Sequence, residues 1–273
     1  MLPIREPAVA GRFYPADPAA LRGEVARCLP SVPAGGAESS AIAVVLPHVG
    51  YVYSGAIAGA ALSRCRVPER ALVLGPNHTG EGAPRALHPP GLFRLPGALV
   101  PVDRPLTESA AREAGLSLDR AAHQHEHAIE VELPLLLAKN PALRMAALCL
   151  SVLDFEQCRE IGLGLARAVR SAGGPAEVLL VASTDMSHYV SAEHARSQDR
   201  LAIERVLALD PEGLYRTVRA ERISMCGFIP TTVALVAARE LGAAEAELIR
   251  YGNSGEVSGD HERVVGYAGI VIR

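Results

Sequence analysis

The 273-residue sequence predicts an α/β fold: a single domain over residues 1–273, with a largely parallel mixed sheet and helices on both faces. Several short apolar runs end in turn residues and are followed by helical patterns, as expected of parallel strands buried on both faces. The composition is 49% hydrophobic and 21% charged, which is typical of a globular chain able to bury a sizeable core. No internal repeat or low-complexity segment divides the chain.

The first half of the chain opens with an arm, to about Tyr14, that has no clear period. Asp17-Pro18 then predicts a helix to about Cys28, with Asp as N-cap and Pro at the first helical position. The stretch 30–40 is the most linker-like. The elements predicted after it are strands at 41–47 and 70–75, helices at about 55–64 and 107–114, and a long loop at 79–104 with one or two short strands.

In the second half, strands and helices alternate. His123 to Lys139 begins as a cluster of His and continues as an amphipathic helix that Pro134 is expected to kink. The other elements predicted are strands at 144–151, 177–183, 247–252 and 264–272, and helices at 155–171, about 192–208, 211–220 and from Cys226-Gly227 to about 241. The long final apolar strand predicts that the sheet is mixed.

Charge and composition argue against several classes of protein. The net charge of −3 provides no general basic field for nucleic acid. The N-terminus carries charges and prolines where a signal peptide needs an apolar region, and no apolar run reaches the ~18 to 20 residues of a membrane span. The five cysteines are scattered and form no C-x-x-C pair, which favours a reducing compartment. We therefore expect a cytoplasmic protein without a nucleic-acid or membrane partner.

Three predicted strands end alike, in LPH, LGPNH and ASTDMSH, which terminate at His48, His78 and His188. Because parallel strands share one carboxyl edge, where open α/β sheets place their ligand sites, we expect these histidines at the same edge. Imidazole is a common ligand of Fe, Cu, Zn and Ni and also a general base near pH 7. The residues alone leave both roles open, beside the simpler role of hydrogen bonding in a loop.

Two other side chains belong to the same argument. Asp185 lies three residues before His188, where it can orient an imidazole, ligate a metal or cap a helix. Cys226 lies where a helix is predicted to begin, and the exposed amides there favour the thiolate, the form that binds metal or attacks. The alternative for Cys226 is a small buried apolar residue.

The cluster from His123 to His127, HQHEH, satisfies H-x-x-E-H, the signature of an inverted zincin with Glu as base. That chemistry needs both His on one helical face, yet His123 follows a loop and the helical period begins only at about Glu126. We therefore expect His127, with Glu130 one turn on, to face the pocket and the earlier two His to be solvated. A zinc hydrolase built on His123 and His127 is kept as a weaker alternative. No phosphate loop and no G-x-S-x-G elbow is present.

Together these segments resemble the Memo family, whose bacterial and archaeal members are called AmmeMemoRadiSam system protein B. The matching stretches cover the chain in order: PAVAGRFYPADP, LPHVGYVYSG, LGPNHTG, EHAIEVELPLL, STDMSHY, MCGFIPTTVAL and YGNSGEVSGDHERVVGYAGIVI. The family is similar in fold to the class III extradiol dioxygenases. The resemblance therefore implies one α/β domain with a metal pocket at the strand ends.

The resemblance also implies roles for individual residues. His48, His78 and Cys226 are the implied metal ligands. His188 stands where the dioxygenases keep their catalytic acid/base. The pocket residues implied are Asp185, which would orient His188, and His127, to which we add Tyr51 from the loop after His48.

The implied thiolate sets this ligand set apart from that of the dioxygenases, which use two His and a carboxylate on Fe(II). Thiolate favours Cu(I), Zn or thiolate-bound iron. We expect one transition metal ion, iron or copper ahead of zinc, used in a redox or dioxygenase-like reaction on a small molecule. The alternative is a non-catalytic module that binds a peptide or small ligand in the same pocket. The family name associates such proteins with radical SAM and AMMECR-like proteins, which are the expected partners.

Overall fold

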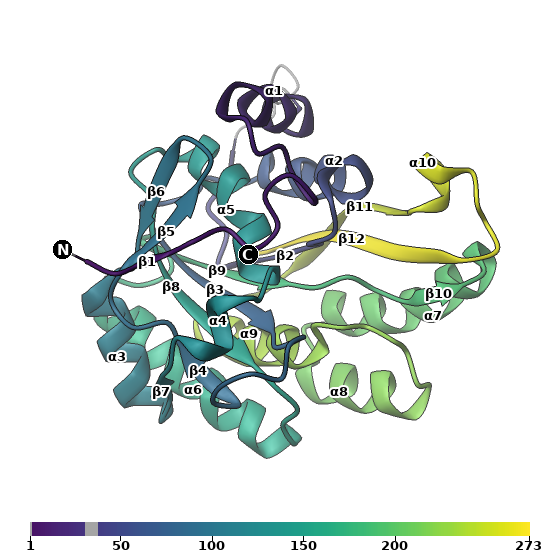
Figure 1. Cartoon of the computed structure of the whole chain (residues 1–273). Coiled ribbons are helices and arrows are strands. Elements are labelled where there is room, and N and C mark those ends of the chain that lie inside the picture. The colour runs from purple at the N-terminus through teal and green to yellow at the C-terminus, as the bar shows by residue number, and fades with distance from the viewer. Residues whose placement is uncertain (1, 31–37) are drawn as a thin grey trace.

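Four neighbouring parallel strands form the centre of the molecule (Figure 1). In spatial order they are β2 (Ala43–Leu46), β9 (Val178–Ser183), β3 (Arg70–Pro76) and β8 (Arg144–Leu150). The computed structural model describes residues 2–30 and 38–273, so most of the predicted linker at 30–40 lies outside the described residues. The four strands lie where the continuous apolar runs predict them.

Antiparallel strands extend this core on both sides into a nine-stranded sheet, so the predicted mixed sheet is confirmed. The strands beyond β2 are β12 (Val264–Ile272), β11 (Ala246–Asn253) and the short β10 (His188–Val190). Beyond β8 lie β4 (Arg85–Leu87) and β7 (Ser117–Leu118). A separate three-stranded sheet consists of β1 (Ile4–Arg5), β5 (Leu92–Leu95) and β6 (Ala98–Pro101).

Helices cover both faces of the sheet, as predicted, and alternate strand residues point into two apolar layers. Val45 and Leu72 belong to one layer, and their neighbours Val44 and Val73 belong to the other. The helices of the first layer are α3 (Arg104–Ala114), α6 (Phe155–Ser171), α7 (Ala192–Leu207), α8 (Pro211–Ala220) and α9 (Phe228–Glu240). Those of the second layer are α1 (Pro18–Cys28), α2 (Tyr51–Leu62) and α5 (Ala128–Lys139). The short helices α4 (Ala121–Gln124) and α10 (Gly255–Ser258) lie outside these layers.

The helix predicted to begin at about Glu126 is confirmed as α5, and the His cluster before it includes the end of the separate short helix α4, with a break around His125. The break has a local cause. The Glu126 carboxylate accepts hydrogen bonds from the N–H groups of His127 and Ala128, at 2.9 and 3.0 Å. These donors would be unsatisfied at a helix start, so Glu126 closes the N-terminus of α5 from the residue before its cap. Elsewhere, α2 begins at Tyr51, four residues before the predicted start.

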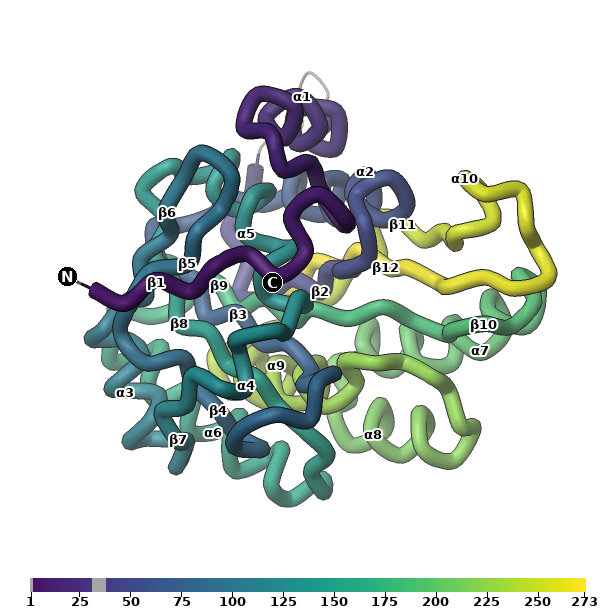
Figure 2. The backbone as a smooth tube through the Cα atoms, in the orientation of Figure 1, coloured from purple at the N-terminus to yellow at the C-terminus, as the bar shows by residue number. Residues whose placement is uncertain are grey.

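The N-terminal arm, residues 4–14, is held by one buried carboxylate on α5. Glu130 accepts hydrogen bonds from the Arg5 guanidinium, the backbone N–H groups of Ala8 and Val9, and the Tyr14 hydroxyl. Figure 2 shows the arm leading from β1 across the molecule to α1. Glu130 thus faces the arm and not, as the helical spacing predicts, the pocket.

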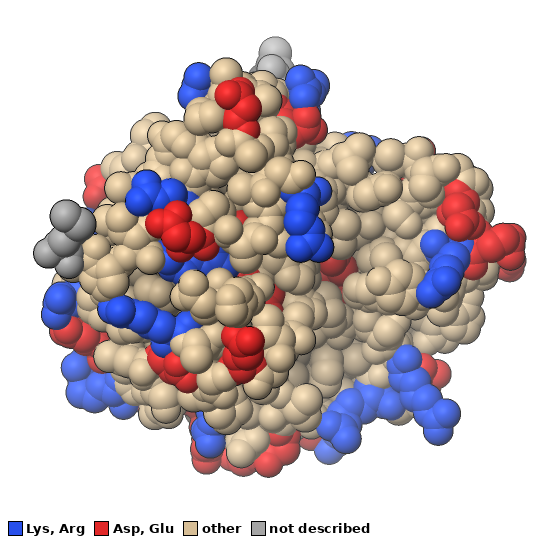
Figure 3. Space-filling model, viewed as in Figure 1, with Lys and Arg blue, Asp and Glu red and all other residues tan. Residues whose placement is uncertain are grey.

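On the face shown in Figure 3, Lys and Arg residues are interspersed with Asp and Glu, and neither sign forms a continuous field there. This distribution agrees with the small net charge of −3. Within the described ranges, none of the helices has the length and hydropathy needed to cross a lipid bilayer.

Two histidines, His88 and His123, form a buried pair outside the predicted site. Their ring centroids lie 5.4 Å apart, and the side chains are nearly inaccessible. His123 Nε2 lies 3.0 Å from the Ala86 carbonyl oxygen and His88 Nδ1 lies 2.6 Å from that of Pro89, so each ring donates one N–H. Burial lowers the pKa of His88 to about 4 and that of His123 to about 3. His123 is therefore buried and neutral rather than solvated as predicted.

These buried neutral histidines predict that the protein loses stability in mild acid. Their pKa values are lower in the folded than in the unfolded chain, so stability is complete above pH ~6.5 and falls as the pH drops towards 4. Each such group removes up to about 1.4 kcal/mol per pH unit. Urea unfolding at several pH values between 7.5 and 5 should show a shallower decline for His123→Gln. The exposed His194→Gln should behave like wild type, and equal slopes for all three proteins would contradict the argument.

Candidate metal centre

Three polar side chains meet at the carboxyl edge of the parallel strands. His48, Asp185 and His78 each follow the last residue of their strand by two positions, and the strands β2, β9 and β3 are direct neighbours. The register therefore places the three loops side by side, where α/β folds bind ligands. The strand-end motifs predicted His48, His78 and His188 at this edge; the structure brings His48 and His78 into one candidate ligand group, whereas His188 belongs to neither group.

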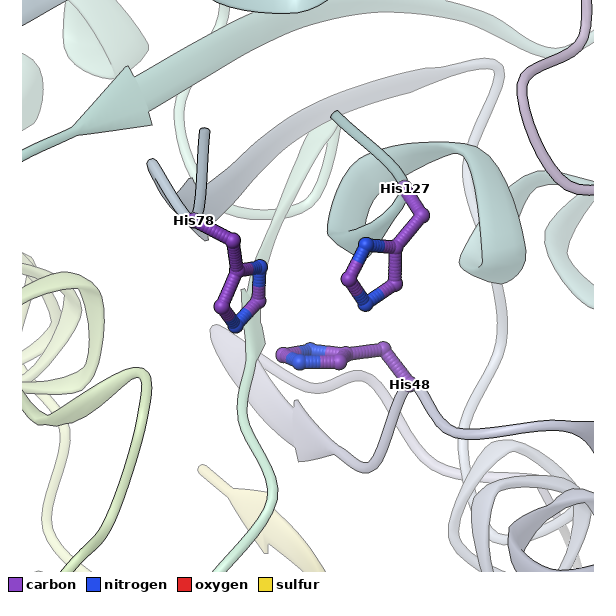
Figure 4. Close-up of side chains that lie close together, drawn as sticks. All are labelled: His48, His78 and His127. Carbon is purple, nitrogen blue, oxygen red and sulfur yellow. The ribbon is translucent and has the colours of Figure 1, made fainter. Parts of the chain in front are cut away.

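A third imidazole, that of His127, joins His48 and His78 from the start of α5 (Figure 4). The ring centroids lie 5.3 Å apart for His48 and His78, 5.4 Å for His48 and His127, and 4.7 Å for His78 and His127. One nitrogen of each ring lies within 4.8 Å of the others. His48 is fully buried, whereas the side chains of His78 and His127 keep 33% and 22% of their exposure. The cluster is thus buried at one end and accessible at the other.

His48 is also part of a second group, with Asp185 and Cys226. Its Nε2 lies 3.4 Å from Cys226 Sγ and 3.5 Å from Asp185 Oδ2. Cys226 precedes the start of α9, and its Sγ accepts the backbone N–H of Asp185 at 3.2 Å. Of the three predicted ligands, His48 therefore lies near both of the others, near His78 in the first group and near Cys226 in the second, and no group among the described residues contains His78 and Cys226 together. The donor set of imidazole, thiol and carboxyl groups suits a transition metal.

The protonation of Cys226 differs from the expectation for a helix start. Burial, and next the Asp185 carboxylate, raise the pKa of the Cys226 thiol well above its usual value. Those two effects outweigh the exposed amides of α9. A thiolate at this position therefore needs a cation beside it.

His48 is held neutral from two sides. Burial, and next the charge of His78, lower the pKa of His48 to about 3. Its Nδ1 lies 2.7 Å from Ser183 Oγ, and its backbone N–H donates to Asp185 Oδ1 at 3.0 Å. Neutral imidazole is the form that ligates metals.

Glu126 orients His78. Its Oε1 lies 2.9 Å from His78 Nδ1, and its Oε2 accepts the His78 backbone N–H at 2.6 Å. Burial alone would raise the pKa of Glu126, but the hydrogen bond and charge of His78, with the N–H of Ala128 and the charge of His127, together outweigh it and the net pKa falls to about 2. An ionised carboxylate behind an imidazole fixes the ring and increases its basicity as a ligand. The sequence motif suggested Glu126 as a base, and only the fold shows which His it contacts.

Comparison with known proteins identifies the family of this chain. The family model described as Memo-like protein matches residues 5–271. The chain belongs to the Memo family. It is 38% identical to a MEMO1 family protein of Methanopyrus kandleri, over 98% of this chain and 99% of the relative. It is also 38% identical to one of Methanococcoides burtonii, over 99% and 100%, and 35% identical to one of Aquifex aeolicus, over 98% and 98%. Its fold is the class III extradiol dioxygenase-like fold of that family, as predicted.

In this Memo-family protein, the predicted acid/base His188 lies at the start of β10, outside both ligand groups. Its Nδ1 lies 2.8 Å from the Ser224 carbonyl oxygen, so Nδ1 carries the hydrogen and Nε2 is the free nitrogen. Burial raises the pKa of Asp185 to about 6, and the nearby charge of His188 opposes that rise. Asp185 bonds the backbone of His48, and no hydrogen bond joins it to the His188 ring within the described ranges.

Tyr51, predicted as a pocket residue, lies in the core between α2 and α5. Its hydroxyl donates to the Val131 carbonyl oxygen at 2.7 Å, and its ring centroid lies 5.9 Å from that of Tyr14. The structure thus places its polar atom against α5 behind the cluster. Phe13, which the sequence reasoning missed, does touch the cluster: its ring packs edge-on against His127 at a centroid distance of 4.9 Å. No local pattern in the arm indicates this contact.

The zinc hydrolase alternative needs His123 and His127 on one face of the same helix, and the structure does not place them there. His123 belongs to α4 and His127 precedes α5, so the two do not share one continuous helix. His123 Nε2 is engaged by the Ala86 carbonyl, and His127 joins His48 and His78 instead. In the described part of the chain, no candidate ligand group includes His123.

Proposed function

We propose that this Memo-family protein binds one transition metal ion, iron or copper, at the strand-end cluster and uses it in a redox or oxygen-dependent reaction on a small molecule. The observation that supports this most is the His48 ring. His48 belongs to both candidate ligand groups, its Nε2 lies near Cys226 and Asp185, and its Nδ1 is engaged by Ser183. A single buried imidazole thus faces four other donors, on His78, His127, Asp185 and Cys226.

The proposed ligands are His48, His78 and Cys226, with His127 as the neighbouring imidazole that could replace the thiol. Bound iron or copper would supply one-electron chemistry. The burial that raises the pKa of Cys226 means that binding as a thiolate displaces a proton. Asp185, with a pKa of about 6, is a proton acceptor 3.5 Å from His48 Nε2.

The remaining residues would handle protons and access. His188 offers a free Nε2 as general acid or base, because Ser224 engages Nδ1. The accessible end of the cluster, at His78 and His127, would admit the small molecule. Radical SAM and AMMECR-like proteins would supply or consume that molecule.

The experiment compares bound metal in wild type, Cys226→Ser and His127→Gln, purified without added metal and measured by elemental analysis. We expect about one ion per chain in wild type and in His127→Gln, and a fall of more than about tenfold in affinity for Cys226→Ser. If Cys226→Ser keeps its metal and His127→Gln loses it, the third ligand is His127 and not Cys226. Equal metal content in all three would contradict the thiolate ligand. Metal without oxygen consumption across a panel of catechols would favour a ligand-binding module.

A further inference from the structure

Behind His48 lie two buried polar side chains, Ser183 and Glu132, that continue its hydrogen bonding into the core. His48 Nδ1 lies 2.7 Å from Ser183 Oγ, and Ser183 Oγ lies 2.9 Å from Glu132 Oε1. Ser183 Oγ also lies 2.7 Å from the backbone carbonyl oxygen of Ala128. Ser183 and Glu132 have no exposed surface. Among the residues described, Glu132 Oε2 has no hydrogen-bond partner.

The single hydrogen of the Ser183 hydroxyl determines which group donates each of these hydrogen bonds. The Ser183 hydroxyl owns one hydrogen and can accept two hydrogen bonds. The Ala128 carbonyl can only accept, so an O···O separation of 2.7 Å requires the Ser183 hydrogen between the two atoms. Ser183 Oγ is then an acceptor towards its other neighbours. His48 must donate from Nδ1, and Glu132 must donate from Oε1, which requires a protonated carboxyl group.

The surroundings of Glu132 favour the same protonated form. Ionising a carboxyl group without exposure to water is costly unless a cation or several donors compensate. Burial raises the pKa of Glu132 well above its usual value; the contact with Ser183 opposes that rise, and the charge of Asp185, another acid, adds to it. Tyr51, on the α2 side, is also an acid. Among the described residues, the groups that act on Glu132 from the β9 and α2 sides therefore include no permanent cation.

We propose that Glu132 is a positioning residue: as a neutral acid it donates to Ser183, and Ser183 in turn holds His48 in the tautomer with hydrogen on Nδ1 and a free lone pair on Nε2. The free lone pair then points to the side where Cys226 and Asp185 lie, at 3.4 and 3.5 Å. This tautomer is expected in the protein without metal. Its contribution to metal binding rests on the function proposed above.

The decisive measurement uses the metal-free protein, so its outcome does not depend on the proposed function. Nitrogen NMR of ¹⁵N-histidine-labelled protein at pH 7, with His48 assigned by its loss in His48→Gln, should show protonated Nδ1 and unprotonated Nε2. Ser183→Ala removes the acceptor and should shift His48 towards a mixture of tautomers. A wild-type His48 protonated at Nε2 would overturn the proposal.

Infrared spectra test the neutral acid directly. At pH 8, wild type should show a protonated-carboxyl band that Glu132→Gln lacks. Glu126→Gln is the matched control, since it removes a buried but ionised carboxylate of the same segment and should leave that band in place. If the spectrum of Glu132→Gln keeps the protonated-carboxyl band, the proposal is overturned.

Metal affinity then separates positioning from mere filling of space. The amide of Glu132→Gln can still donate to Ser183, so affinity should stay within about twofold of wild type, whereas Glu132→Met should lose about tenfold or more. Equal losses in the two variants would overturn the proposal. If wild type binds no metal but the NMR and infrared results hold, the proposed function fails while the tautomer stands.

Discussion

Replacing His48 by Ala is expected to lower metal affinity more than any other single change at the cluster. In the part of the chain that the structure describes, His48 is shared by both candidate ligand groups, so its loss leaves neither group complete. Changes to residues behind the ligands typically cost 10–100-fold, so loss of a central ligand should exceed about 100-fold, or roughly 2.7 kcal/mol. Titration of metal-free protein with Fe(II) or Cu(I) under anaerobic conditions, followed by elemental analysis, measures this loss.

The matched control for that experiment is His125→Ala. His125 belongs to the same His-rich segment, but its side chain is exposed and pairs with Glu81 at the surface. This variant should bind metal like wild type. Near-UV circular dichroism verifies that His48→Ala remains folded. Full metal content in folded His48→Ala would rule out the strand-end cluster as the metal site.

Breaking the buried ion pair between Arg5 and Glu130 should be the largest single-site effect on stability. Arg5→Met leaves the Glu130 carboxylate buried without its cation and removes the hydrogen bonds that Arg5 donates to the backbone of His123 and Glu126. Removing one partner of a buried pair typically costs about 3–5 kcal/mol. Urea denaturation followed by circular dichroism gives the free energy of unfolding.

Arg94→Met provides the control, because Arg94 and Glu6 form an exposed ion pair that also ties the arm to β5. An exposed pair contributes about 0–1 kcal/mol, so this variant should be close to wild type. Adding Glu130→Gln to Arg5→Met should recover part of the loss, since the uncompensated charge is removed. A cost for Arg5→Met as small as that for Arg94→Met would contradict the argument.

The arm links the two predictions, since the residues that Glu130 fixes include Tyr14, next to the Phe13 that packs on His127. Loosening the arm should therefore disturb the position of His127 more than that of His48. His48 is anchored independently by Ser183 and Asp185. Metal affinity of Arg5→Met is then expected to fall less than that of His48→Ala.

Local sequence patterns were sufficient for much of the fold. The apolar runs predicted β2, β3, β8 and β9, because strands buried on both faces need no polar alternation. Asp17 and Asp210, each followed by Pro, predicted the starts of α1 and α8, because the side chain caps the free N–H groups and Pro suits the first turn. The helical period also predicted the start of α5 to within two residues of Glu126, whose side chain accepts the N–H groups of His127 and Ala128.

The sequence by itself also determined which strand ends carry imidazoles, since the carboxyl edge of a parallel sheet is common to its strands. Only the tertiary structure decided what each imidazole contacts. Glu126 contacts His78, which lies 48 residues away in the sequence. Ser183 and Cys226 contact His48 from 135 and 178 residues away. Such pairings depend on strand order and on the direction of each side chain in the packed core. Neither is encoded in local periodicity, so the protein's candidate site could be located from its sequence but not assembled from it.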